Sequence, residues 1–209
     1  MEEIDKVLEA LSVVERYEEY LFNRSWGRAL IVIGILLPLG VIVNMNAVLV
    51  ATALGIDVGY VSILASVITV LLCFGFIAYT FFGAWRTVKK KSDEKRSGSL
   101  HGPLIGITWF LVFYLTTLSP ASMQMISLLW AASASCILSF VILRVTGGHS
   151  QDQLLLYLGL LLGIVSLPLL LLTDQILVGY IALIAFSSCF ILGGIMMHRI
   201  AAQSLEVST

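Results

Sequence analysis

Long apolar stretches alternate with short polar links along most of this chain. Between Arg28 and Arg199, no Lys, Arg, Asp, Glu or His lies in the middle of any stretch. A helix needs about 20 apolar residues to cross the hydrocarbon core of a bilayer. The 103–143 region is too long for one helix, and Ser119-Pro120 provides a turn that divides it. The pattern therefore predicts six membrane-spanning helices, at about 28–51, 58–83, 103–119, 121–143, 153–173 and 176–197.

The composition agrees with this pattern. The 209 residues are 59% hydrophobic and 12% charged, whereas a soluble domain carries about 25% charged residues. Too little polar surface remains to cover six apolar helices in water. We therefore predict an all-α integral membrane bundle of six transmembrane helices. The net charge of −1 does not favour binding to nucleic acid.

The basic residues are distributed unevenly among the links. The links after the first, third and fifth stretches are short and hold no Lys or Arg, whereas Arg86 to Arg96 and Arg144 to Asp152 are basic or polar. Arg24, Arg28 and Arg199 flank the whole apolar region. Because Lys and Arg accumulate in cytoplasmic loops, we predict cytoplasmic termini and cytoplasmic longer loops. We expect the plasma membrane as the location.

Residues 1–26 have the pattern of a cytoplasmic amphipathic helix. Their apolar residues recur at helical spacing on one face, and residues 1–24 hold seven of the thirteen acids. Helices that lie on anionic membranes usually carry Lys and Arg instead. Two interpretations stay open: the helix contacts the chain's own loops or lies along the membrane, or it docks a partner helix or a second copy. The predicted organisation is thus this helix, a transmembrane domain at 27–199 and a cytoplasmic tail at 200–209.

An internal repeat is suggested by two of the stretches. The second begins VGYVSILA from Val58 and the sixth begins VGYIALIA from Val178, with four identical positions. This similarity favours three tandem helical hairpins that all enter from the cytoplasm, as parallel repeats. The alternative is chance similarity within a small apolar alphabet.

Four polar residues near the outer ends of the stretches form the candidate ligand site. They are Asn44, Asn46, Tyr60 and Gln124. Polar groups at membrane depth must find partners. They would surround a polar ligand at the outer mouth, or they would form hydrogen bonds between helices. A stripe of small residues at Ala131, Ser135 and Ser139 predicts close helix packing.

The sequence gives little support for a metal site, a cofactor or an enzyme active site. Cys73, Cys136 and Cys189 lie within apolar stretches without metal-ligand spacing. Methionines suit Cu(I), but these lie at opposite predicted membrane sides. We expect no metal and no cofactor. Motifs of metalloproteases, P-loop enzymes and serine hydrolases are missing, so we do not expect an enzyme.

The spans hold no carboxylate to couple ion flow. We therefore expect a transport-related subunit that handles a neutral or lipid-like substrate, or that works beside a separate energising partner. The alternative is a structural or assembly subunit with no substrate of its own. Expected partners are membrane lipids and a protein partner or a second copy. A polar cavity lined by the candidate site residues would favour transport, whereas bonded amides in a packed bundle would favour the structural role.

Overall fold

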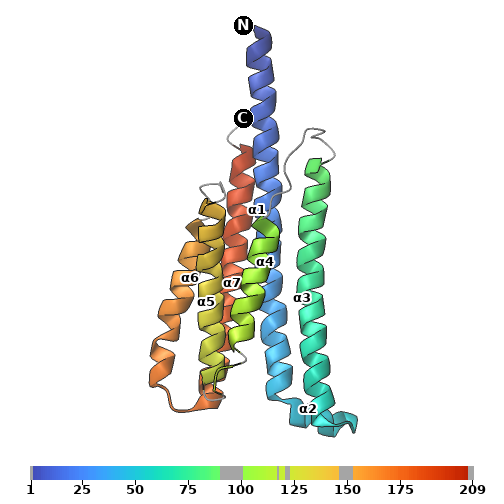
Figure 1. Cartoon of the computed structure of the whole chain (residues 1–209), viewed down its shortest axis with the longest axis vertical. Helices are drawn as coiled ribbons and strands as arrows, with labels where there is room; N and C mark the ends of the chain where they lie inside the picture. Colours follow the sequence, from blue (N-terminus) through green and yellow to red (C-terminus); the bar gives the residue numbers. More distant parts are fainter. Residues whose placement is uncertain (1, 90–100, 117, 121–122, 146–152, 207–209) are drawn as a thin grey trace. The chain divides into compact units, whose positions relative to one another are not determined.

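A computed structural model describes residues 2–89, 101–116, 118–120, 123–145 and 153–206 (Figure 1). Within these ranges the chain is helical and holds no strand. The helices are α1 (Glu2–Met45), α2 (Ala47–Leu54), α3 (Val58–Lys89), α4 (His101–Thr116), α5 (Gln124–Val145), α6 (Gln153–Ser166), the 3₁₀ turn η3 (Pro168–Leu171) and α7 (Gln175–Glu206).

Among the residues that the structure describes, five regions are long and apolar enough to cross a membrane, which supports an integral, multi-pass membrane protein. They are Tyr20–Met45, Val58–Thr80, Gln124–Val145, Gln153–Leu171 and Gln175–Gln203. The prediction of six spans is not confirmed, because the region predicted at 103–119 forms a shorter apolar helix. With 16 residues, α4 is about 24 Å long. A bilayer's hydrocarbon core is about 30 Å thick.

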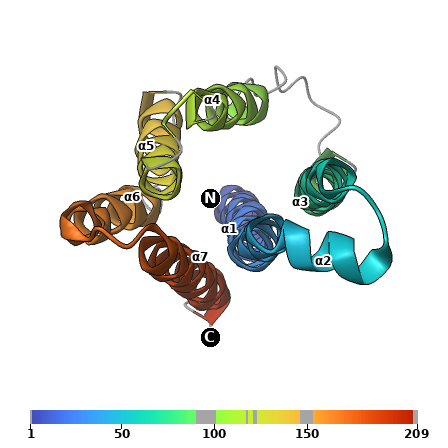
Figure 2. The same ribbon diagram turned by 90° about the horizontal axis from the view of Figure 1, so that it is seen from below.

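The chain divides into two compact units. The first unit comprises Met1–Glu94 and Ile191–Thr209, and the second comprises Lys95–Phe190. Helix α7 contributes its beginning to the second unit and its end to the first. Figure 2 shows the long helices of each unit nearly end-on and α2 from the side.

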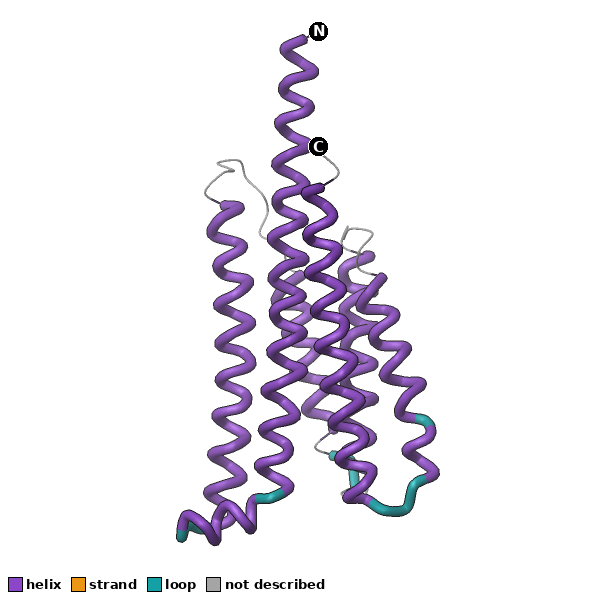
Figure 3. Tube along the Cα trace, turned by 180° about the vertical axis from the view of Figure 1, so that it is seen from behind, coloured by secondary structure: helices purple, strands orange, loops and turns teal. Residues whose placement is uncertain are grey.

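In the first unit, α1 is one uninterrupted helix. Its 44 residues extend for about 66 Å, and they join the amphipathic segment predicted at 1–26 to the first span without a break. Its N-terminal part extends beyond the ends of α3 and α7 (Figures 1 and 3). This segment therefore continues the helix that forms the first candidate span.

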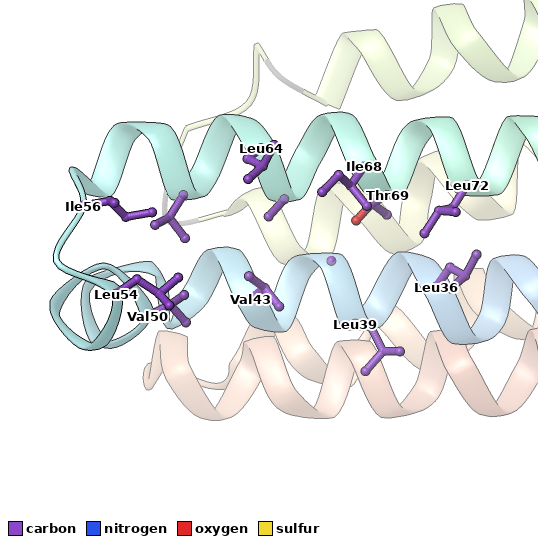
Figure 4. A pocket seen from close by; sticks show the side chains of 13 residues that line it. Leu36, Leu39, Val43, Val50, Leu54, Ile56, Leu64, Ile68, Thr69 and Leu72 are labelled. Atoms are coloured by element: carbon purple, nitrogen blue, oxygen red, sulfur yellow. The ribbon is translucent and has the colours of Figure 1, made fainter.

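The first span also ends differently from the prediction. Helix α1 stops at Met45, before the predicted end at 51, and α2 follows after a turn at Asn46. Helix α2 lies across the ends of α1 and α3, as its end-on appearance in Figure 4 shows. The link between the first two spans is thus a short helix in its own right.

In the second unit, α5 contacts both α4 and α6. The predicted small-residue stripe is buried there, since Ala131, Ser135 and Ser139 are all at most 4% exposed. Phe186 and Phe190 of α7 stack with ring centroids 4.3 Å apart. This unit therefore has a packed core of small and aromatic side chains.

The predicted repeat of three hairpins is not confirmed. The first link contains the crosswise helix α2, whereas α6 and α7 are joined through η3 and an extended segment (Figure 3). The similar starts of α3 and α7 therefore do not extend to the links before them.

Candidate functional site

The first unit contains an apolar groove between α1, α2 and α3 (Figure 4). Its volume is about 370 Å³, within the range of about 300–1,000 Å³ that is typical of small-molecule sites. The lining side chains are Leu36, Leu39, Val43, Val50, Leu54, Ile56, Val61, Leu64, Ala65, Ile68, Thr69 and Leu72, with Gly40 on the wall of α1.

A close approach between α1 and α3 lies beside the groove. A Cβ atom on Gly40 would overlap the side chain of Thr69, at 2.7 Å from Thr69 Cγ2. Only a residue without a side chain lets the two helices meet at this point. The side chains around this contact are branched or longer. They leave the space of the groove on both sides of the contact.

The turns around α2 close the far end of the groove. Gly55 has a φ of +67° and ends α2 in the left-handed region, which glycine adopts without strain. The Asp57 carboxylate accepts the backbone N–H of Gly59 at 2.7 Å and caps the start of α3. Ala47 and Ala51 of α2 are buried together with Val61. Two small residues four positions apart therefore let α2 lie against α3.

The groove offers shape and apolar contact but almost no polarity. Thr69 contributes the one hydroxyl among its lining side chains. Leu39, Leu54 and Leu64 are each more than half exposed, so the groove is open at its side. For an acyl chain that enters from a bilayer, apolar burial alone gives no net attraction because lipid tails are equally apolar. Selective binding would depend on the fit of an aliphatic chain to these walls.

Two of the four predicted site residues direct their amides to nearby groups. Asn44 Nδ2 donates to the Gly40 carbonyl at 3.1 Å and to Ser66 Oγ at 3.2 Å. Asn46 Nδ2 donates to the Ile42 carbonyl at 2.8 Å. Neither residue lines the groove. A ligand-binding role for these amides stays a prediction.

The other two predicted site residues lie elsewhere. Tyr60 is on α3, 72% exposed, and does not line the groove. Gln124 begins α5 in the second unit and is exposed. The groove itself was missed because its aliphatic lining has the composition of any lipid-facing helix. Gly40 and the Ala47/Ala51 pair are the signals in the sequence that point toward it.

The polar side chains of the second unit join its helices. Trp109 Nε1 donates to Ser139 Oγ at 2.8 Å, and that hydroxyl donates to the Ser135 carbonyl at 2.7 Å. Ser133 Oγ donates to the Gly159 carbonyl at 2.7 Å, which links α5 to α6. Such bonds are a common device for joining membrane helices.

A second tryptophan makes a similar link. Trp130 Nε1 donates to Ser166 Oγ at 2.8 Å, and Ser166 Oγ donates to the Gly163 carbonyl at 2.6 Å. Each tryptophan therefore joins two helices through a serine that is itself bonded to its own helix. These hydrogen bonds stabilise the unit and use most of the hydrogen-bonding capacity of the serine and tryptophan side chains.

Comparison with known proteins identifies no relative. No protein-family model, no curated protein and no solved structure matches this chain. The function is therefore argued from the geometry.

Proposed function

We propose that this protein is a transport-related membrane subunit that handles a neutral, lipid-like substrate in the groove of its first unit. The observation that carries the proposal is the aliphatic lining of the groove together with the exposure of Leu39, Leu54 and Leu64 on its walls. A charged substrate does not fit this proposal, because the walls offer no group to pair with a charge. An acyl or isoprenoid chain fits when its shape matches these walls, because apolar contact alone gives no net attraction in a bilayer.

The proposal includes a separate source of energy. The candidate spans contain no carboxylate at membrane depth, so the chain lacks a residue for ion coupling. A protein partner or a second copy would supply the driving force, and the acidic start of α1 is the candidate docking element. The uneven distribution of Lys and Arg supports a plasma-membrane orientation with both termini cytoplasmic.

A structural or assembly role is the second candidate. It is favoured by the second unit, in which buried serine hydroxyls and tryptophan N–H groups join helices. It is also favoured by the amides of Asn44 and Asn46, which are hydrogen-bonded and do not line the groove. In this role, an apolar helix of a partner would occupy the groove in place of a lipid chain.

Photo-crosslinking with a phospholipid that carries a diazirine in its acyl chain tests the proposal. Ala65 lines the groove and is small, so Ala65→Phe would fill the space. Val70 lies on the same helix, is half-exposed and does not line the groove, so Val70→Phe is the matched control. We expect crosslinked peptides from α1 to α3 in the wild type and in Val70→Phe, with a large loss in Ala65→Phe.

Two results would contradict the lipid proposal. Equal labelling of the two variants would show that the reagent reports general lipid contact. Crosslinking of a second polypeptide to the groove residues in native membranes, without lipid adducts there, would favour the structural alternative.

A further inference from the structure

A cluster of cationic and polar side chains lies at the other end of the apolar part of α1, within the first unit. Arg24 and Arg28 are one helical turn apart, so they share a face of α1. Asn23, Ser25 and Trp26 of the same turn are buried. The Ser25 hydroxyl lies 3.5 Å from the Thr80 carbonyl of α3. The cluster is therefore held on a packed part of the unit.

A glycine contact brings the end of α7 to this face. A Cβ atom on Gly27 would lie 2.8 Å from the Gly194 carbonyl oxygen, and one on Gly194 would lie 2.6 Å from the Gly27 carbonyl oxygen. The same Gly27 Cβ would lie 3.1 Å from His198 Cδ2. His198 therefore lies next to the turn of α1 that carries the two arginines, and it is within electrostatic range of both.

One of the arginines is held in place by an aromatic side chain. Arg24 Nη1 donates to Tyr20 Oη at 2.7 Å, and the guanidinium carbon lies 5.6 Å from the centroid of the same ring. Tyrosine orients the group without neutralising it. Arg28, one turn further along, is exposed. Two arginines and a histidine thus lie on or next to one turn of α1, and the Arg24 guanidinium is already positioned.

Among the side chains that the structure describes, Arg24 and Arg28 have no carboxylate as a counter-charge. Like charges at i and i+4 on a helix repel each other, and no Asp or Glu lies three or four positions from either arginine. The described side chains include two carboxylates, Asp57 and Asp174, and both accept backbone N–H groups at the starts of α3 and α7. An external anion would relieve the repulsion.

We infer that Arg24, Arg28 and His198 bind the phosphate of an anionic phospholipid. Guanidinium groups bind phosphate oxygens through paired N–H donors. The cluster borders the apolar part of the span, next to Trp26, where headgroups lie. This position favours a lipid phosphate over a free one, because the acyl chains contact the apolar surface that follows.

This site is independent of the proposed function. Arg28 and Gly40 are twelve residues apart on one helix, which corresponds to about 18 Å along its axis. A headgroup held at Arg28 therefore belongs to the membrane leaflet that is predicted to be cytoplasmic, whereas the groove lies toward the opposite face. Loss of either site would leave the other intact.

Native mass spectrometry of the full chain tests the inference. The protein would be released from nanodiscs of phosphatidylcholine mixed with an equal part of phosphatidylglycerol, and the bound lipids counted. We expect retention of phosphatidylglycerol in the wild type. Each single Arg→Gln substitution should lower the preference of the protein for phosphatidylglycerol over phosphatidylcholine about fivefold. Arg24→Gln with Arg28→Gln should lower this preference about thirtyfold, because each base near an anionic surface contributes a similar free energy.

Matched variants distinguish a specific phosphate-binding site from general electrostatic attraction to anionic lipid. Arg144→Gln removes one charge at the end of α5, so it is the control for Arg28→Gln and should have a smaller effect. Arg24→Lys with Arg28→Lys keeps the charge but loses the paired donors, so we expect partial retention. A thermal unfolding curve for each variant confirms that it is folded.

Three outcomes would overturn the inference. They are equal phosphatidylglycerol retention in the wild type and the folded double Gln variant, an equal loss in Arg144→Gln and Arg28→Gln, and full displacement of the lipid by methyl phosphate alone. The first two would show diffuse electrostatic attraction. The third would show a site for free phosphate.

Discussion

Helices α3 and α5 are both strongly apolar, yet they are buried to different extents. The mean hydropathy of the most apolar window is 2.6 in α3 and 2.2 in α5. However, 11% of that window is buried in α3 and 56% in α5. The more hydrophobic helix is therefore the less buried one. In a membrane, hydrophobicity places a helix in lipid, but small and hydroxyl side chains decide which helices meet.

The difference follows from the side chains at their contacts. Helix α5 presents Ala131, Ser135 and Ser139 to its neighbours, and Ser133 bonds to α6. Helix α3 meets α1 at the contact of Thr69 with Gly40 and exposes Leu71 and Tyr79. The second unit is thus organised for packing. The first leaves an apolar surface and a groove for lipid or a partner.

The largest expected effect concerns the glycine contact between α5 and α6. In Gly159→Ala the new Cβ would lie 2.7 Å from Ile137 Cγ1 and 2.8 Å from the Ser133 carbonyl oxygen. We expect the free energy of unfolding to fall by about 1–3 kcal/mol, because the backbone must move apart. Thermal unfolding in detergent, followed by near-UV circular dichroism, would measure this.

Gly75→Ala on α3 is the control for this change. A Cβ atom there would meet nothing within 4 Å, so we expect no loss of stability. If both substitutions have the same effect, then the contrast between a packed α5 and a lipid-exposed α3 is wrong.

The next effect concerns the α1–α3 contact in the first unit. In Gly40→Ala the new Cβ would overlap the Thr69 side chain, so we expect a lower free energy of unfolding. Thr69→Ala removes the side-chain atoms that this Cβ would overlap. In a double-mutant cycle we expect a coupling energy of about 0.5–3 kcal/mol. Additive effects of the two substitutions would contradict direct packing at this point.

A smaller effect is expected for the buried serines of α5, one of which bonds to α4. Ser139→Ala removes the acceptor of the Trp109 indole N–H, and bonds between membrane helices contribute about 0.6 kcal/mol on average. Ser135 Oγ is buried but has no hydrogen-bond partner within the part of the chain that the structure describes. Ser135→Ala should therefore be neutral or slightly stabilising. Equilibrium unfolding with tryptophan fluorescence would compare the two, and a larger loss in Ser135→Ala would contradict these roles.

The smallest effect is expected at the candidate ligand site of the first unit. Asn44→Leu removes the amide bonds to the Gly40 carbonyl and Ser66 Oγ. We expect a change in stability of about 0.6 kcal/mol or less and unchanged lipid crosslinking in the groove. Loss of crosslinking with normal stability would instead assign Asn44 a direct role in ligand binding.

Much of the secondary structure could be predicted from the sequence. Five candidate membrane spans lie where long apolar stretches were predicted, and the predicted turn near Pro120 separates α4 from α5. Helix α1 passes from its acidic start into the span, and no Pro or Gly lies between Glu2 and Trp26 to interrupt it. The same helix also continues through Gly27 and Pro38, residue types that commonly mark a break.

The candidate site was less predictable than the helices. The small residues of α5 indicated packing because they recur at helical spacing, and the structure confirms their burial. The groove depends on Gly40 meeting Thr69, 29 positions away along the chain. No local pattern identifies that pairing. Asn44 and Asn46 were predicted as site residues because they are polar, and their amides form hydrogen bonds to nearby groups.

The amino-acid sequence by itself indicated the apolar spans and the uneven distribution of positive charge. The first is a sum of local transfer free energies, and the second is a count of Lys and Arg in each link. Tertiary structure alone decided which apolar faces are buried and which meet lipid. Hydrophobicity is the same on both kinds of face, so only the meeting of small residues on different helices, as at Gly40 with Thr69 and Gly27 with Gly194, separates them. The groove and the cationic cluster both follow from those meetings.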